Sequence, residues 1–166
     1  DYYGAISDYT KAIELNPNFA DAYSDRAVSK RNLKDYYGAI SDYTKAIELN
    51  PNDTSAYFYR GSIKTTDLKD YGGAISDYTK AIELDPNASY VFAMRGISKK
   101  NLKDYYGAIS DYTRAIELNP NYTSAYVSRG ISKEYLGDLN GACADWKKAA
   151  RLGDADAAKW VANQCN

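Results

Sequence analysis

The amino-acid sequence predicts an all-α protein in which antiparallel helix pairs stack into a solenoid. The first observation is internal repetition: the segment DYYGAISDYTKAIELNPN begins at Asp1 and recurs unchanged at Asp35. Close variants begin at Asp70 and Asp104, and a diverged copy, DLNGACADWKKAARLGDA, begins at Asp138, so the copies start 34 or 35 residues apart. A period of that length is typical of helix–turn–helix arrays. The second observation is that apolar residues within each copy recur at the three- and four-residue spacings of a helix.

The repeated segment carries the start and stop signals of a helix. Asp35 is a favourable N-cap, and Asn50-Pro51 ends the helix because proline disfavours helical backbone in the residue before it. The more variable segments 22–34 and 56–69 also predict helices. Each period is therefore expected to hold a variable helix A followed by a nearly constant helix B. The apolar stripe of helix B in the second copy is Ala39, Ile40, Tyr43, Ala46, Ile47 and Leu49.

Applied along the chain, this pattern predicts ten helices in one solenoid over residues 1–166. The second repeat has one extra residue near Lys64–Leu68, where we expect a local irregularity. Near the C-terminus, Trp160 occupies the position of the first aromatic residue of another helix A. The expected parts are an unpaired helix B (1–17), a repeat (20–53), a repeat with the insertion (54–88), a repeat (89–122), a diverged repeat (123–153) and a C-terminal capping helix (154–166).

These residues resemble the tetratricopeptide repeat (TPR) over essentially the whole chain. Helix A carries the family's aromatic residue (Tyr23, Tyr57, Phe92, Tyr126) and a small residue four positions later (Ala27, Gly61, Gly96, Gly130), and helix B carries the pattern of Ala39, Tyr43, Ala46 and Pro51. The resemblance implies a right-handed superhelix that presents a concave groove lined by the A helices. The chain departs from the family where leucine and tyrosine are usual in helix A, because it has Arg and Lys there.

The substituted Arg and Lys lie four residues apart on the face of helix A that should meet helix B. Buried cations need partners, and helix B offers an aspartate in one register. We therefore expect a structural ladder, with one Arg–Asp rung in each repeat and no catalytic role. Its predicted members are Arg26, Arg60, Arg95 and Arg129, with Asp8, Asp42, Asp77, Asp111 and Asp145.

The family resemblance also implies which residues face the groove. The expected set has an apolar centre with polar edges, which suits an extended or helical segment of a protein partner. It lacks the Lys, Asn and Arg clamp with which some family members hold a terminal carboxylate. The predicted groove residues are Asp21, Ser24, Val28, Arg31, Asn32, Ser55, Phe58, Ser62, Tyr90, Ala93, Ile97, Lys100, Asn101, Ser124, Val127, Ile131, Glu134 and Tyr135.

A protein-interaction scaffold is thus the leading hypothesis, and two alternatives remain open. The first helix B has no helix A before it, so Ile6, Tyr9 and Ile13 form an uncovered apolar face that favours self-assembly. The second alternative is an RNA or an acidic partner on a basic ridge, although a net charge of −1 weighs against general nucleic-acid binding. That ridge would consist of Lys30, Arg31, Lys34, Lys64, Lys69, Lys99, Lys100, Lys103 and Lys133.

Several classes of protein and site are disfavoured by composition. There is no histidine, no phosphate-binding glycine loop and no nucleophile motif, so we expect no enzyme activity, no metal and no cofactor. No apolar stretch is long enough to span a bilayer. The first residue is Asp and not Met, which suggests that the N-terminus is truncated. Asn52, Asn87 and Asn121 match the glycosylation sequon, but all fall at the same inter-repeat turn, which turn chemistry explains more simply.

The two cysteines lie near the C-terminus. Two are too few for a disulfide scaffold, so a reducing, cytoplasmic location is the default expectation. Cys143 replaces the core isoleucine of helix B, which predicts a buried free thiol. A bridge from Cys143 to Cys165 that would staple the capping helix is the alternative.

Overall fold

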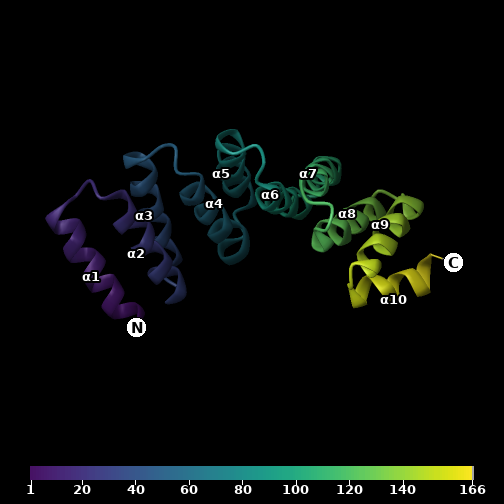
Figure 1. The fold of residues 1–166 in the computed structure, drawn as a ribbon, viewed down its shortest axis with the longest axis horizontal. Coiled ribbons are helices and arrows are strands. Elements are labelled where there is room, and N and C mark those ends of the chain that lie inside the picture. The colour runs from purple at the N-terminus through teal and green to yellow at the C-terminus, as the bar shows by residue number, and fades with distance from the viewer. Residues whose placement is uncertain (166) are drawn as a thin grey trace. The chain divides into compact units, whose positions relative to one another are not determined.

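The structure, a computed structural model, describes residues 1–165, which form ten α-helices and no strand (Figure 1). The predicted all-α fold is therefore confirmed. The helices gather into two compact units, the first from Asp1 to Pro86 and the second from Asn87 onward. The first unit contains α1 (Tyr2–Leu15), α2 (Ala20–Asn32), α3 (Tyr36–Leu49), α4 (Thr54–Ile63), the π-helical turn η1 (Lys64–Leu68) and α5 (Tyr71–Leu84). The second contains α6 (Ser89–Asn101), α7 (Tyr105–Leu118), α8 (Thr123–Tyr135), α9 (Leu139–Arg151) and α10 (Ala155–Gln164).

The B helices begin at the aspartates that the repeat pattern marks. The carboxylates of Asp35, Asp70, Asp104 and Asp138 each accept a hydrogen bond from the backbone N–H three residues later, at 2.8 to 3.0 Å. These bonds satisfy helix donors that have no partner within the helix. In the first unit the helix ends at Leu49, directly before the Asn-Pro stop.

The core of each repeat is one large ring of helix B against a small residue of helix A. Tyr43, Tyr78, Tyr112 and Trp146 are at most 1% exposed. A Cβ atom added at Gly61 would lie 2.9 Å from the Tyr78 ring, and one added at Gly130 would lie 2.4 Å from the Trp146 indole nitrogen. The glycines therefore allow the ring to touch the helix A backbone. Burial raises the pKa of Tyr78 to about 12, so its phenol is neutral at physiological pH.

The residue before the N-cap aspartate of each helix B from α3 onward adopts a left-handed backbone conformation. The φ angles of Lys34, Lys69 and Lys103 are 64°, 59° and 64°, and Gly137 takes the same position with φ 82°. A side chain at positive φ is costly, whereas glycine adopts it freely. These lysines were predicted as part of a basic ridge, but the backbone shows that they also terminate helix A in a conformation that glycine would tolerate better.

We predict that Lys103→Gly stabilises the protein, by about 0.5–1 kcal/mol, because it relieves the left-handed strain without removing a helical residue. Thermal unfolding followed by circular dichroism measures the change. The matched control is Lys100→Gly in the last turn of α6, where the backbone is helical and glycine should destabilise by a similar amount. Shifts of the same sign in both variants would contradict the prediction.

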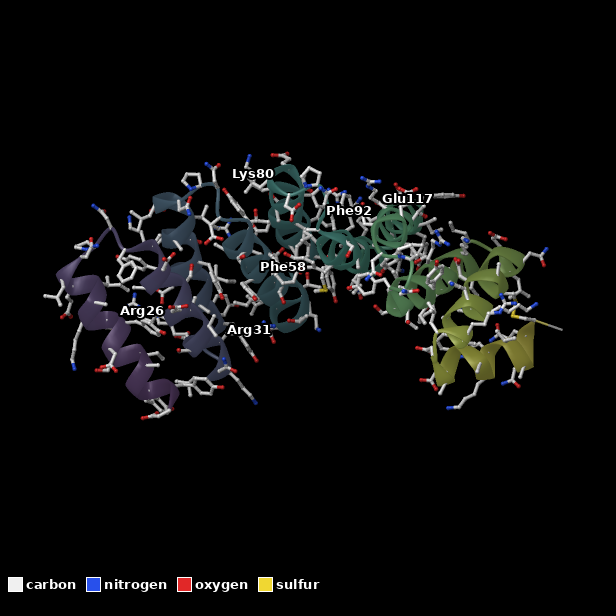
Figure 2. All side chains as sticks on the ribbon, viewed as in Figure 1. Arg26, Arg31, Phe58, Lys80, Phe92 and Glu117 are labelled. Atoms are coloured by element: carbon white, nitrogen blue, oxygen red, sulfur yellow. A yellow bond between two sulfur atoms is a disulfide. The ribbon has the colours of Figure 1, made fainter. Side chains whose placement is uncertain are left out.

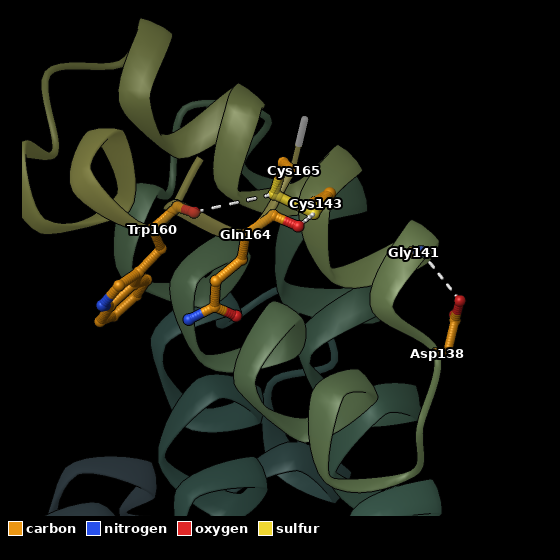
Figure 3. Close-up of a disulfide and its surroundings, with 6 residues drawn as sticks. All are labelled: Asp138, Gly141, Cys143, Trp160, Gln164 and Cys165. Atoms are coloured by element: carbon orange, nitrogen blue, oxygen red, sulfur yellow. Dashed lines mark hydrogen bonds between the residues drawn. A yellow bond between two sulfur atoms is a disulfide. The ribbon is translucent and has the colours of Figure 1, made fainter. Parts of the chain in front are cut away.

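The prediction of a free thiol at Cys143 is wrong. Cys143 in α9 and Cys165, directly after α10, form a disulfide with their Cα atoms 5.6 Å apart (Figure 3). The bond forms because α10 folds back along α9, where the Trp160 ring lies 5.3 Å from the Trp146 ring. The disulfide therefore ties the capping helix to the last complete repeat.

Candidate functional site

Each complete repeat contains a buried cluster of one aspartate and two cations. In the first, Arg26 donates from Nε and Nη2 to the two carboxylate oxygens of Asp42, at 2.9 and 2.8 Å. Lys30 lies 2.7 Å from the same carboxylate, whose side chain is only 5% exposed. The other three clusters have the same arrangement: Arg60, Lys64 and Asp77; Arg95, Lys99 and Asp111; and Arg129, Lys133 and Asp145.

The arginine of a cluster also contacts the preceding helix B. Arg26 Nη1 donates to Thr10 on α1 at 3.0 Å, so the guanidinium lies between α1 and α3 (Figure 2). Arg60 and Arg129 make the equivalent bonds to Thr44 and Thr113. The guanidinium carbon of Arg26 also lies 5.6 Å from the centre of the Tyr23 ring, a cation–π distance. One side chain thus joins three successive helices.

Asp8 does not join the ladder that the sequence pattern predicted for it. Its side chain is 81% exposed, and its ion pair, at 3.9 Å, is with Lys11 of the same helix. Asp8 lies in the same 18-residue sequence as Asp42, but among residues 1–165 no helix A covers that side of α1. No residue of α1 is fully buried, whereas the identical α3 buries five. The predicted self-association residues Ile6, Tyr9 and Ile13 are therefore half-buried.

The A-helix face of the first unit has two adjoining hollows, of about 310 and 180 Å³. Both are lined by Val28, Tyr43 and Tyr59, which form their shared apolar wall. Val28 and Tyr59 are each 43% exposed, and the Ser24 hydroxyl in the smaller hollow has no hydrogen-bond partner among the described residues. We call these two hollows the unit 1 groove. The larger is further lined by Arg31, Asn32, Lys34, Tyr36 and Asp67, and the smaller by Ser24, Asp25, Asp53, Ser55 and Ala56.

The extra residue of the second repeat shapes one end of the unit 1 groove. It is absorbed in the π-helical turn η1, which directs Asp67 and Thr66 toward α2. Arg31 donates to Asp67 from Nε and to Thr66 from Nη2, each at 3.2 Å. The turn is also anchored inward, since Thr65 shares a hydrogen bond with the buried Tyr78 hydroxyl at 3.2 Å. The insertion therefore adds a polar wall that the other repeats lack.

The predicted groove residues of the first unit are only partly those that line its hollows. Ser24, Val28, Arg31, Asn32 and Ser55 do so. Asp21 is exposed outside them, and Ser62 is buried, at 8% exposure. Phe58, labelled in Figure 2, is half-buried, and its ring centre lies 5.3 Å from that of Tyr59 and 6.0 Å from that of Tyr78. Sequence reasoning missed Tyr59, for which an aromatic residue at an otherwise variable position of helix A was the available signal.

In the second unit, the predicted residues also divide between core and surface. Ala93 is 4% exposed and belongs to the core, which corrects its placement in the groove. Tyr135 is exposed and stacks on Tyr105 with ring centres 4.9 Å apart. The remaining predicted residues are exposed or half-buried: Tyr90, Ile97, Lys100, Asn101, Ser124, Val127, Ile131 and Glu134.

The proposed basic ridge is largely occupied by interactions within the chain. Lys30, Lys64, Lys99 and Lys133 pair with the buried aspartates, and Arg31 pairs with Asp67. Charges neutralised in this way are not available to release counterions from a nucleic acid. The ridge therefore offers much weaker support for nucleic-acid binding than the sequence pattern suggested. Separately, among residues 1–165 no helix combines the length and apolar character needed to cross a bilayer.

Comparison with known proteins agrees with this architecture. Family models described as tetratricopeptide repeat match residues 20–53, 54–88 and 90–122. No curated protein sequence matches the chain at a significant level.

Solved structures of similar fold include a crystal structure of MamA, with a TM-score of 0.89 at 24% identity over 95% of this chain and 92% of that one. Others are MamA from Desulfovibrio magneticus RS-1 (TM-score 0.85, 18% identity, 91% of this chain and 85% of that one) and PilF of Pseudomonas aeruginosa (0.78, 22%, 88% and 66%). At sequence identities of 24% and below, these similarities are evidence for the fold alone.

Proposed function

Because the chain belongs to the tetratricopeptide repeat family and has the fold of a protein-interaction scaffold, we propose that its unit 1 groove binds a short segment of a partner protein. The observation that carries this proposal is the pair of adjoining hollows with a shared apolar wall of Val28, Tyr43 and Tyr59. Binding sites for polypeptide segments typically combine such apolar anchoring surface with a few polar groups that set orientation.

The polar groups at the two ends of the unit 1 groove differ in charge. The smaller hollow has the carboxylates of Asp25 and Asp53, and the larger has the cation Lys34 beside the Arg31–Asp67 ion pair. A complementary segment would carry a basic residue, then an apolar or aromatic anchor, then an acidic residue.

The experiment is selection of binding peptides from a random displayed library on the immobilised full chain. We expect enriched peptides to share a basic–apolar–acidic order, and we expect Val28→Glu to abolish their binding because it places a charge on the apolar wall. Loss of one such central anchor typically costs 2 kcal/mol or more, about a thirtyfold loss of affinity. Fluorescence anisotropy with a selected peptide measures it.

The matched control is Ser41→Glu, which adds the same side chain to an exposed position of α3 that does not line either hollow. Peptide affinity should be unchanged in this variant. Equal binding by the wild type and Val28→Glu would disprove the assignment of the groove.

A further inference from the structure

Three of the turns between repeats carry the acceptor sequence for N-linked glycosylation. The tripeptides are Asn52-Asp53-Thr54, Asn87-Ala88-Ser89 and Asn121-Tyr122-Thr123. None of them has proline in the middle position, which would prevent modification. Each of the three asparagines is exposed, and each serine or threonine is the first residue of a helix A. The acceptor sequences therefore lie on the surface of the folded chain, where modification requires them to be.

The structure separates the residue that shapes the turn from the asparagine of the acceptor sequence. The Asn50 side chain accepts a hydrogen bond from the backbone N–H of Asn52 at 3.3 Å, and Asn119 does the same for Asn121 at 3.1 Å. Asparagine stabilises turns through this type of bond. Among residues 1–165, the side chains of Asn52 and Asn121 make no hydrogen bond, and neither residue has a positive φ. Turn chemistry, which the sequence favoured, therefore explains Asn50 and Asn119 but gives the other two side chains no role.

The hydroxyl residue of the acceptor sequence is not required by the fold either. The helix α2 begins at Ala20 after a turn in which the Phe19 N–H donates to the Asn16 carbonyl at 3.1 Å. The turn before α8 has the equivalent bond, from Tyr122 to Asn119 at 3.0 Å. The first repeat thus shows that alanine can begin helix A after the same turn.

Thr123 illustrates how little its hydroxyl contributes to the start of α8. It provides no cap for the helix, and its hydroxyl donates to the carbonyl of Asn121 at a long distance, 3.4 Å. The contact joins two residues of the same acceptor sequence. The hydroxyl is therefore available for recognition by an enzyme at little cost to the fold.

The disulfide between Cys143 and Cys165 is an independent indication of the compartment (Figure 3). Disulfides form and persist in oxidising compartments such as the lumen of the endoplasmic reticulum, and are rare in the cytosol. Chains that enter such compartments also meet the enzymes that attach N-linked glycans. The disulfide and the acceptor sequences thus favour the same location, which differs from the reducing one expected from the number of cysteines.

We propose that Asn52, Asn87 and Asn121 are attachment sites for N-linked glycans. The sugar donor would be an oligosaccharide joined to a lipid through a diphosphate. The asparagine Nδ2 would form a bond to the anomeric carbon of the first sugar, and the bond from that carbon to the diphosphate oxygen would break. The lipid diphosphate leaves with the electron pair of that bond, and Nδ2 gives up one proton.

The test uses the chain isolated from the cells in which it naturally occurs. Its proteolytic peptides are fragmented by electron transfer in a mass spectrometer, which leaves a glycan on the residue that carries it. We expect glycans on the three proposed asparagines and none on Asn18, which is exposed in the equivalent turn but is followed by Phe19-Ala20. Unmodified asparagine at all three positions, or a glycan on Asn18, overturns the proposal.

Two substitutions made in the same cells exchange the hydroxyl between the first and the fourth of these turns. Thr123→Ala should end modification of Asn121, and Ala20→Thr should create a new attachment site at Asn18. Asn121→Gln, which keeps the hydroxyl, should lose the glycan as Thr123→Ala does. A glycan that stays on Asn121 in Thr123→Ala contradicts the proposal.

The glycosylation proposal does not depend on the unit 1 groove, because none of the three asparagines lines either hollow. Val28→Glu should therefore carry the same glycans as the wild type, so the two proposals fail separately.

Discussion

Asp42→Ala is expected to destabilise the protein by about 3 kcal/mol, or roughly 10 °C in its unfolding temperature. The Asp42 side chain is 5% exposed and is the shared partner of Arg26 and Lys30. Removing it leaves two largely buried cations without an anion, and the cost of that desolvation is no longer offset. Asp42→Asn, which keeps the size of the side chain, should recover only part of the loss because the charge is still missing. Thermal and urea unfolding followed by circular dichroism measure the difference.

The repeat supplies an unusually well matched control for this substitution. Asp8→Ala is made within the same 18-residue sequence, so any effect on intrinsic helix propensity is the same for both variants. Because Asp8 is 81% exposed and pairs only weakly, at 3.9 Å, with Lys11, the unfolding midpoint should not change measurably. Equal losses in the two variants would show that the aspartate acts through the helix alone and that the buried cluster contributes no stability.

Reduction of the Cys143–Cys165 disulfide is expected to release α10 from α9. The bridge closes a segment with a sequence separation of 22, for which loop closure contributes about 3 kcal/mol. The helix itself has little to hold it otherwise, since Ala157 is its one buried residue. The surrounding repeat should stay folded because the Trp146 ring, besides its contact with Trp160, lies against Gly130 of α8.

Tryptophan fluorescence measures the release of α10, because Trp146 and Trp160 are the two tryptophans of the chain. Trp160 leaves its contact with Trp146 when α10 detaches, so emission should shift to longer wavelength after reduction. Trp160→Phe should reduce the shift to the part that comes from Trp146, and Cys165→Ser should show it without reductant. Unchanged emission in a sample whose two thiols are shown by alkylation to be reduced would refute the expectation.

The sequence was sufficient to predict the helices and the residues that meet between them. The capping Asp35, the terminating Asn50-Pro51 and the small Gly61 act through contacts a few residues or one helix away, and the repeat displays each contact several times. The family resemblance is likewise confirmed by matches over most of the repeats. These local features can be predicted from sequence because the same residue types recur at the same positions of each repeat.

Other features depend on neighbours that the pattern does not encode. Asp8 and Asp42 have the same surrounding sequence and opposite environments, because α2 packs on Asp42 and no helix A within residues 1–165 packs on Asp8. The disulfide depends on the angle at which α10 returns to α9. Within α4, the side chain of Ser62 points inward while the neighbouring Tyr59 faces the groove, which a register carried over from other family members did not predict.

In the first unit, each ladder arginine contacts three successive helices, and these contacts affect how the repeats unfold. Arg26 holds α1 and α3 through one guanidinium, and Arg60 does the same for α3 and α5. Melting of one hairpin therefore removes a bond from the next, so that neighbouring hairpins in the first unit lose structure together. These cations add to the apolar packing that couples adjacent hairpins, which makes the cooperativity of unfolding a property of the interfaces more than of the individual helices.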